Sequence, residues 1–277
     1  MVNCGRCMSC RINRTSQWAQ RLMMELPYWE KSCFITLTYD DDHIPPDRSL
    51  HVEEMQLFWK RVRKLTGAKL KNYYCGEYGD EFLRCHYHAI VFGVDFAPWE
   101  FVSYKNGRKV FTSSLLADCW QHRGFVTVSD VTYQDCAYVA GYVQKKLYGK
   151  MAAYYKDHGL VPPFAHASKG LSLDYTYDHC DQLSMNQFVW SNGHKSPLPR
   201  YVSGKLGLLD TDEFGHSPMY YKAMEITKQR QQKFYEKHRL DPDVNESWVK
   251  WHNADRSAAL QKELDLQARY GEVPDEI

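Results

Sequence analysis

The chain has 277 residues, with 35 lysines and arginines against 34 aspartates and glutamates, so its net charge is only +1. Hydrophobic residues make up 44% and charged residues 25%, which excludes a disordered chain, a collagen-like fibre and a coiled-coil rod. No apolar run approaches the ~18 residues that a membrane-spanning helix needs.

Nine cysteines, and a start without the apolar stretch of a secretory signal, favour reduced thiols in a cytoplasm. Aromatic residues make up 14% of the chain; they are core material first, but they also stack on the bases of single-stranded nucleic acid. The near-zero net charge argues against a protein that coats nucleic acid by bulk charge alone.

The first 150 residues alternate between helical and strand patterns. Helical periodicity marks residues 14–30, 53–65, 115–121 and 133–147. Runs of β-branched and aromatic residues predict strands over residues 33–39, 72–77, 86–92 and 125–131, and Asn106-Gly107 predicts a hairpin over 102–110. Hairpins join most of these strands, so we expect an α+β fold with an antiparallel sheet and flanking helices.

The second half of the chain is less regular. Residues 149–217 are rich in Gly, Pro and His and are predicted to be irregular, whereas residues 218–270 are helical and charged, with a break at Asp241-Pro242. We therefore expect one domain over residues 1–217, including a Cys-rich segment at 1–13, and a helical C-terminal extension over 218–277.

His86-Tyr87-His88 is the sharpest chemical feature of the sequence. Side chains alternate faces along a strand, so His86 and His88 project to one side about 7 Å apart, where two imidazoles can bind one divalent ion. The apolar residues 89–92 place this strand in the middle of the sheet. Two histidines hydrogen-bonded at a strand end would show the same pattern, which leaves a structural role open.

Glu77 ends the preceding predicted strand, just before the turn. A hairpin there can bring its carboxylate beside both imidazoles. Two histidines and one carboxylate leave coordination positions open, as a catalytic metal site requires. Glu81 is the rival ligand if the hairpin register differs, and an exposed acid at a strand end is the structural alternative for Glu77.

Tyr138, Tyr142 and Lys145 share one face of the helix predicted over 133–147. At ~100° per residue, the helix carries its apolar stripe on roughly the opposite face, so neither tyrosine is expected in the main core. A phenol is a poor nucleophile at its usual pKa near ~10, and a nearby cation and metal would have to activate it. Two surface tyrosines with a solvated lysine are the alternative.

The two groups make chemical sense as one machine. A metal polarises a phosphodiester, a tyrosine attacks it, and a 5′-phosphotyrosine forms with release of a 3′-OH. Two tyrosines on one helix face would allow one transfer to open a strand and another to close it.

These features resemble the HUH endonucleases, and most closely the replication initiator proteins of Microviridae, the gokushovirus-type phages with small circular single-stranded DNA. The matching segments run in order along the chain: CGRCMSCR (4–11), FITLTY (34–39), GEYGDEFLRCHYHAIVFG (76–93), WQHRGFVTV (120–128), YVAGYVQKK (138–146) and PLPRYV (197–202).

The resemblance implies that His86 and His88 are the HUH metal ligands and that Glu77 is the third ligand. It also implies that Tyr142, in Y-x-x-K with Lys145, is the usual nucleophile and that Tyr138 is the second one. The fold would be a five-stranded antiparallel sheet with flanking helices. The activity would be site-specific nicking and rejoining of single-stranded DNA in rolling-circle replication, with Mg²⁺ or Mn²⁺, in a bacterial host cytoplasm. Nothing after residue 202 is covered.

Cys4, Cys7 and Cys10 have a spacing that could hold Zn²⁺, but a closed structural site needs a fourth ligand. Cys33, Cys85 or a histidine would have to supply it through the fold; free thiols near the N-terminus are the alternative. Interleaved basic residues could equally contact DNA phosphates: Arg6, Arg11 and Arg14.

Residues 60–72 include six basic residues and no acidic one. The candidate DNA-backbone contacts in this run are Lys60, Arg61, Arg63 and Lys64, and a solvated helix face is the alternative.

The chain has no Walker A motif and no G-x-G-x-x-G, so we expect no nucleotide cofactor. The expected partners are single-stranded origin DNA and a separate helicase and polymerase of the host, with no membrane. Two other functions stay open. One is a metal-dependent hydrolase that does not use the tyrosines, and the other is a non-catalytic zinc-binding module that binds single-stranded DNA.

Overall fold

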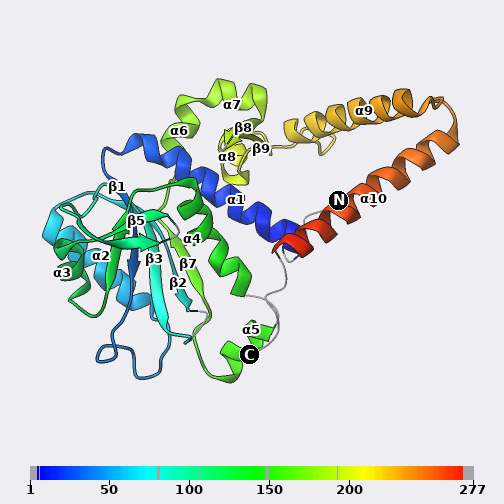
Figure 1. Ribbon diagram of the computed structural model, residues 1–277. Helices are drawn as coiled ribbons and strands as arrows, with labels where there is room; N and C mark the ends of the chain where they lie inside the picture. Colours follow the sequence, from blue (N-terminus) through cyan, green and yellow to red (C-terminus); the bar gives the residue numbers. More distant parts are fainter. Residues whose placement is uncertain are drawn as a thin grey trace. The chain divides into compact units, whose positions relative to one another are not determined.

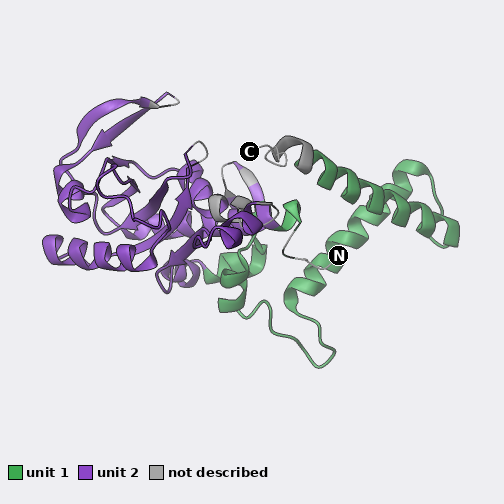
Figure 2. Cartoon of the chain, turned by 90° about the horizontal axis from the view of Figure 1, so that it is seen from below, with its two compact units in different colours: residues 1–10, 180–189, 196–277 green, residues 11–179, 190–195 purple. Residues whose placement is uncertain are grey.

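The computed structural model describes residues 5, 7–79, 82–105, 107–146, 150–191 and 193–270, without the side chains of 105, 142–146, 150, 191, 194 and 267–270. The chain forms two compact units (Figure 2). Unit 2 comprises residues 11–179 and 190–195, and unit 1 comprises residues 1–10, 180–189 and 196–277. The expected domain boundary at residue 217 stays a prediction.

Unit 2 is built around one large sheet. Its elements are α1 (Met8–Glu25, whose first turn belongs to unit 1), η1 (Leu26–Tyr28), β1 (Ser32–Leu37), α2 (Val52–Thr66), β2 (Lys71–Tyr78), β3 (Cys85–Phe92), β4 (Glu100–Lys105), β5 (Arg108–Thr112), α3 (Ser114–Trp120), β6 (Val126–Ser129), α4 (Tyr133–Lys146), α5 (Lys150–Asp157), β7 (Phe164–Ala167) and α6 (Leu173–Asp178).

The sheet has seven strands in the order β4-β5-β6-β1-β3-β2-β7, and all paired strands are antiparallel. The predicted α+β class with an antiparallel sheet is confirmed, but the sheet has seven strands rather than about five. The strand that the sequence pattern missed is β7, which pairs with β2 inside the segment predicted to be irregular. It is only four residues long and half of it is exposed, so it shows no apolar alternation.

Helices cover both faces of the sheet (Figure 1). One set of alternating strand residues, such as Ile35, Leu37 and Tyr87, packs against α2 and α3. The other set, such as Tyr73, Cys75 and Ile90, packs against α1 and α4. The central strands are therefore buried on both sides, as their nearly continuous apolar sequences require.

The N-terminus of α4 is capped as its sequence predicts. The Asp135 backbone N–H donates to Thr132 Oγ1 at 3.3 Å, and the Thr132 backbone N–H donates to the Asp135 carboxylate at 2.9 Å. This reciprocal capping box fixes where α4 starts. The apolar residues Cys136, Val139 and Ala140 then hold the helix against β2 and β3.

The segment predicted to be irregular also contains several short elements besides β7. They are α5, α6, α7 (Cys180–Asn186), β8 (Phe188–Ser191), β9 (His194–Pro197) and α8 (Arg200–Lys205). None exceeds eight residues, and a segment that short contains too few turns or alternations for a clear period.

The C-terminal part of unit 1 is helical, as predicted, with α9 over Pro218–His238 and α10 over Asn245–Tyr270. The break falls at the predicted Asp-Pro position, after Arg239 in a left-handed conformation (φ 51°). Phe234 and Trp251 pack across the two helices with ring centroids 5.5 Å apart. In the part of the chain that the structure describes, no helix has the length and apolar content needed to cross a membrane.

Candidate active site

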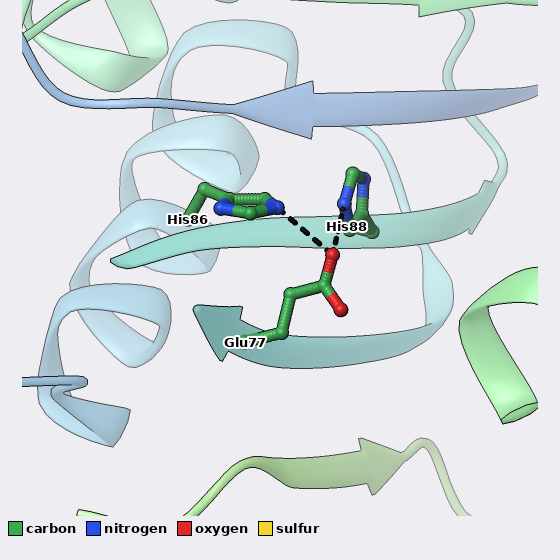
Figure 3. A group of neighbouring side chains, drawn as sticks. All are labelled: Glu77, His86 and His88. Carbon is green, nitrogen blue, oxygen red and sulfur yellow. Dashed lines mark hydrogen bonds and ion pairs between the residues drawn. The ribbon is translucent and has the colours of Figure 1, made fainter. Parts of the chain in front are cut away.

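The β2–β3 hairpin brings three potential metal ligands together. Glu77 lies directly opposite His86 in the strand register, and His88 projects from the same face two residues further along β3. One ligand atom from each side chain lies within 4.8 Å of the others. Within the described ranges, this is the one group of three His, Cys, Asp or Glu side chains so arranged (Figure 3).

Both imidazoles reach the same carboxylate oxygen. The Nε2 atoms of His86 and His88 lie 2.8 Å and 2.9 Å from Glu77 Oε1. The Glu77 side chain is fully buried, and burial alone would raise its pKa. The hydrogen bonds from His86 and His88 outweigh that effect and lower the pKa of Glu77, so the carboxylate is charged at neutral pH.

The far side of the His86 ring decides which nitrogen faces Glu77. His86 Nδ1 lies 3.1 Å from the backbone carbonyl oxygen of Arg84. A carbonyl only accepts hydrogen bonds, so Nδ1 carries the proton and a neutral imidazole turns its Nε2 lone pair toward Glu77. A lone pair and a carboxylate oxygen repel each other, so a cation is needed between them. A second proton on the imidazole supplies that charge without metal, and a divalent ion can replace it.

Two further observations fit the group to a divalent ion. His88 Nδ1 is held at 2.9 Å by Thr36 Oγ1, which leaves its Nε2 toward Glu77 as well. The second carboxylate oxygen, Glu77 Oε2, is buried and has no hydrogen-bond partner among the described residues. Two imidazole nitrogens and a carboxylate with an unsatisfied oxygen are ligands suited to Mg²⁺ or Mn²⁺ with open positions.

Residues of β1 form the wall beside His88. Thr36 pairs with His88 in the register, and the Phe34 ring stacks on the imidazole with centroids 5.7 Å apart and planes 19° apart. Sequence reasoning missed both residues. The alternation along 34–37 puts them on one face, but only the β1–β3 register shows that this face meets the histidines.

Tyr138 reaches the same group from α4. Its hydroxyl lies 3.4 Å from Glu77 Oε1 and 3.4 Å from His88 Nε2, while 42% of the residue is exposed. The expectation that this tyrosine lies outside the main core is confirmed. Tyr142 and Lys145 belong to the same helix, but their side chains are outside the described residues, so their roles stay predictions. Glu81, the rival ligand, is also outside the described residues.

The candidate zinc ligands are only partly described. Cys4 lies outside the described residues, and Cys7 and Cys10 lie just before and within the first turn of α1, so a zinc site there stays a prediction. The two cysteines considered as a fourth ligand, Cys33 and Cys85, are buried in the core beneath α2. Burial raises the pKa of the Cys33 thiol, which favours a packing role over metal binding.

The candidate DNA contacts Lys60, Arg61, Arg63 and Lys64 lie on α2, which covers the sheet face opposite Glu77 and the histidines. Arg61 is partly buried and donates through Nε to the Cys119 carbonyl at 2.8 Å, while the other three are exposed. Their contact with DNA stays a prediction.

Residues 32–147 match the model of a family described as replication-associated protein ORF2. The chain belongs to this family. It is 32% identical over 212 residues to the replication-associated protein VP4 of Bdellovibrio phage phiMH2K, covering 72% of this chain and 65% of that protein. It is 30% identical over 231 residues to the replication-associated protein ORF4 of Chlamydia phage 1, covering 80% and 57%.

A third relative is the replication-associated protein ORF2 of Spiroplasma virus 4, which is 28% identical over 227 residues, covering 77% of this chain and 70% of that protein. The chain thus spans less than two thirds of the length of the first two relatives. No solved structure matches it. The resemblance to phage replication proteins is confirmed, and the segment that matches the family model contains Glu77, His86, His88 and Tyr138.

Proposed function

We propose that this protein nicks and rejoins single-stranded DNA at an origin and thereby initiates rolling-circle replication of a small circular phage genome. The reaction class is that of an HUH endonuclease with a tyrosine nucleophile. Support comes from the relatives, which are replication-associated proteins of phages, and from the chemistry of the Glu77–His86–His88 group.

The observation that carries the proposal is the position of the Tyr138 hydroxyl, 3.4 Å from both Glu77 Oε1 and His88 Nε2. A surface tyrosine without a function has no reason to point its hydroxyl at a buried group of potential metal ligands. A hydroxyl beside a cation site is placed to attack a phosphate that the same site polarises.

Glu77, His86 and His88 would hold Mg²⁺ or Mn²⁺. When bound, the ion withdraws electron density from a phosphate oxygen and stabilises the charge that develops during attack. Arg84 and Thr36 orient the two imidazoles through their Nδ1 atoms, and Phe34 fixes the plane of the His88 ring.

The tyrosine oxygen forms a bond to phosphorus, and the bond from phosphorus to the 3′ oxygen breaks. The products are a 5′-phosphotyrosine and a 3′-OH, and the phenol proton is transferred, in net terms, to the departing 3′ oxygen. Reversal of this step by a 3′-OH closes a strand. Tyr138 and Tyr142 are proposed as the two nucleophiles and Lys145 as a residue that orients the phosphate, whichever tyrosine attacks first.

The test is cleavage of circular single-stranded phage DNA with Mn²⁺, resolved on a denaturing protein gel. The set of proteins is wild type, Tyr138→Phe, Tyr142→Phe, the double variant and His88→Ala. Tyr133→Phe, on the same helix, is the matched control. A DNA-linked protein band should require metal, vanish in the double variant and in His88→Ala, and persist in the control.

Cleavage without any covalent band would refute the tyrosine mechanism and identify a metal-dependent hydrolase. DNA binding that survives in His88→Ala, with no cleavage by wild type on any strand of a phage genome, would identify a binding module. A host helicase and polymerase complete the proposed reaction in the host cytoplasm, because the chain has no nucleotide-binding motif of its own.

A further inference from the structure

The β4–β5 hairpin at the edge of the sheet carries exposed aromatic side chains that the proposed site does not use. Phe101 is 53% exposed and Tyr104 is 64% exposed, with Val102 at 41% beside them. Edge strands usually protect themselves with charge, because exposed apolar edges promote aggregation. Large apolar side chains gathered on such an edge indicate a binding surface.

The register places the aromatic residues on one face of the hairpin. Phe101 is opposite Phe111, Val102 is the extra residue of a bulge, and Tyr104 is opposite Lys109. The Phe101 ring lies 5.2 Å from that of Tyr104 and 6.1 Å from that of Phe111. Together they form an aromatic stripe, defined as Trp99, Phe111, Phe101 and Tyr104.

The stripe is anchored at one end and charged at the other. Trp99 and Phe111 pack against the core beneath α2, which fixes the base of the hairpin. At the outer end, the exposed Lys109 lies across from Tyr104. Exposed rings with an adjacent cation match the contacts of single-stranded nucleic acid, whose bases stack on aromatic side chains and whose phosphates attract cations.

The other face of the hairpin is fixed to the helix that carries Tyr138. Arg108 donates to both carboxylate oxygens of Asp135, at 2.8 Å and 3.0 Å, and also to the Asp130 carbonyl. Asp135 is buried and belongs to the capping box of α4. The hairpin is therefore held in place before any ligand arrives, which reduces the entropic cost of binding.

We propose that the aromatic stripe binds single-stranded DNA by base stacking on Phe101 and Tyr104, with Lys109 contacting the backbone. This inference rests on the proposed function and adds a second DNA contact away from the nick. Single-stranded rather than duplex DNA fits the stripe, because duplex bases already stack on each other and offer no free face. Local contacts of this kind are needed since the net charge is only +1.

The stripe and the candidate active site are well separated in the sheet. Strands β5, β6 and β1 lie between β4 and β3, so four strand spacings separate them, about 19 Å across a flat sheet. The stripe also faces α2, whereas Glu77 and His86 face α4. A single DNA strand that contacts both must pass over the sheet edge, so short oligonucleotides cannot engage the stripe and the site together.

The experiment measures the dissociation constants of the full chain for oligodeoxythymidines of two lengths by fluorescence anisotropy, because stacking tolerates any base. Phe101→Leu and Tyr104→Leu remove a ring but keep apolar surface, while Phe101→Tyr and Tyr104→Phe keep the ring. Val102→Ala, in the same bulge, is the matched control. Thermal unfolding of each variant checks the hairpin packing.

Each ring-removing variant should weaken binding of the long oligonucleotide by about five- to 150-fold. The ring-keeping variants and Val102→Ala should bind as wild type does. Binding of an oligonucleotide too short to reach the hairpin from the site should not change. Equal affinities of the leucine variants and wild type for the long oligonucleotide would overturn the proposal, and would assign the stripe to a protein partner.

Loss of duplex binding alone, with single-strand binding intact, would also overturn it. The covalent-adduct assay separates this inference from the proposed function. Wild type that forms the adduct, with leucine variants that bind DNA normally, refutes the stripe and leaves the nickase standing. Wild type that binds through the stripe but forms no adduct refutes the nickase and leaves the stripe standing.

Discussion

Thr36→Val tests the metal site without relying on nicking activity. The change removes the hydroxyl that holds His88 Nδ1 at 2.9 Å, but it keeps the β-branched shape that β1 favours. Without that hydroxyl, His88 loses the contact that fixes which of its nitrogens faces Glu77. Loss of such an orienting hydrogen bond typically weakens metal binding about 10- to 100-fold, or about 1.4 to 2.7 kcal/mol.

The assay is calorimetric titration of Mn²⁺ into the wild type, Thr36→Val and Thr36→Ser, with His88→Ala as the zero point. Thr36→Ser keeps the hydroxyl and should bind within a few-fold of wild type. Thr127→Val, at the position paired with Thr36 on β6, is the matched control. If Thr36→Val binds Mn²⁺ as tightly as wild type, the argument that side-chain orientation builds this site is wrong.

Three further predictions concern stability. Because the folded pKa of Glu77 lies below its usual value of 4.5, its charge stabilises the fold above that pH and this contribution is lost as pH falls through the folded pKa. The difference in unfolding free energy between wild type and Glu77→Gln should therefore shrink on acidification, and a constant difference in urea melts at several pH values would contradict this. Trp120→Ala should cost about 3–5 kcal/mol, since Trp120 is fully buried among Tyr39, Phe58 and Tyr87; an unchanged urea midpoint would exclude that packing role. Gly93→Ala should lower the thermal midpoint by several degrees or prevent folding, because its Cβ would lie 2.2 Å from the Lys69 carbonyl and φ is +99°.

The parts of the site within one hairpin could be predicted from the sequence. Glu77 and His86 are nine residues apart, and the turn between two evident strands brings them together. A strand period of two then puts His88 on the same face. What the sequence left open between Glu77 and Glu81 was the register, which depends on how the turn is built.

The parts that come from distant segments could not be predicted. Thr36 is 52 residues from His88, and Tyr138 is 50 residues from it. The helical period placed Tyr138 off the apolar face of α4, but only the packing of α4 on β2 and β3 directs its hydroxyl to Glu77. β7 was missed for a related reason, since its place in the sheet comes from pairing with β2 rather than from its own four residues.

The charge pattern alone pointed to α2 as the DNA-binding surface, whereas the structure offers a better-supported surface on the hairpin. A basic run on a helix is compatible with simple solvation, and one of its members, Arg61, is already bonded to the Cys119 carbonyl. The hairpin combines exposed rings, a cation and a rigid link to α4 through Arg108. The two surfaces make opposite predictions: Lys60→Gln with Lys64→Gln should change binding of a long oligodeoxythymidine less than Tyr104→Leu does, and the reverse order would assign the DNA to α2.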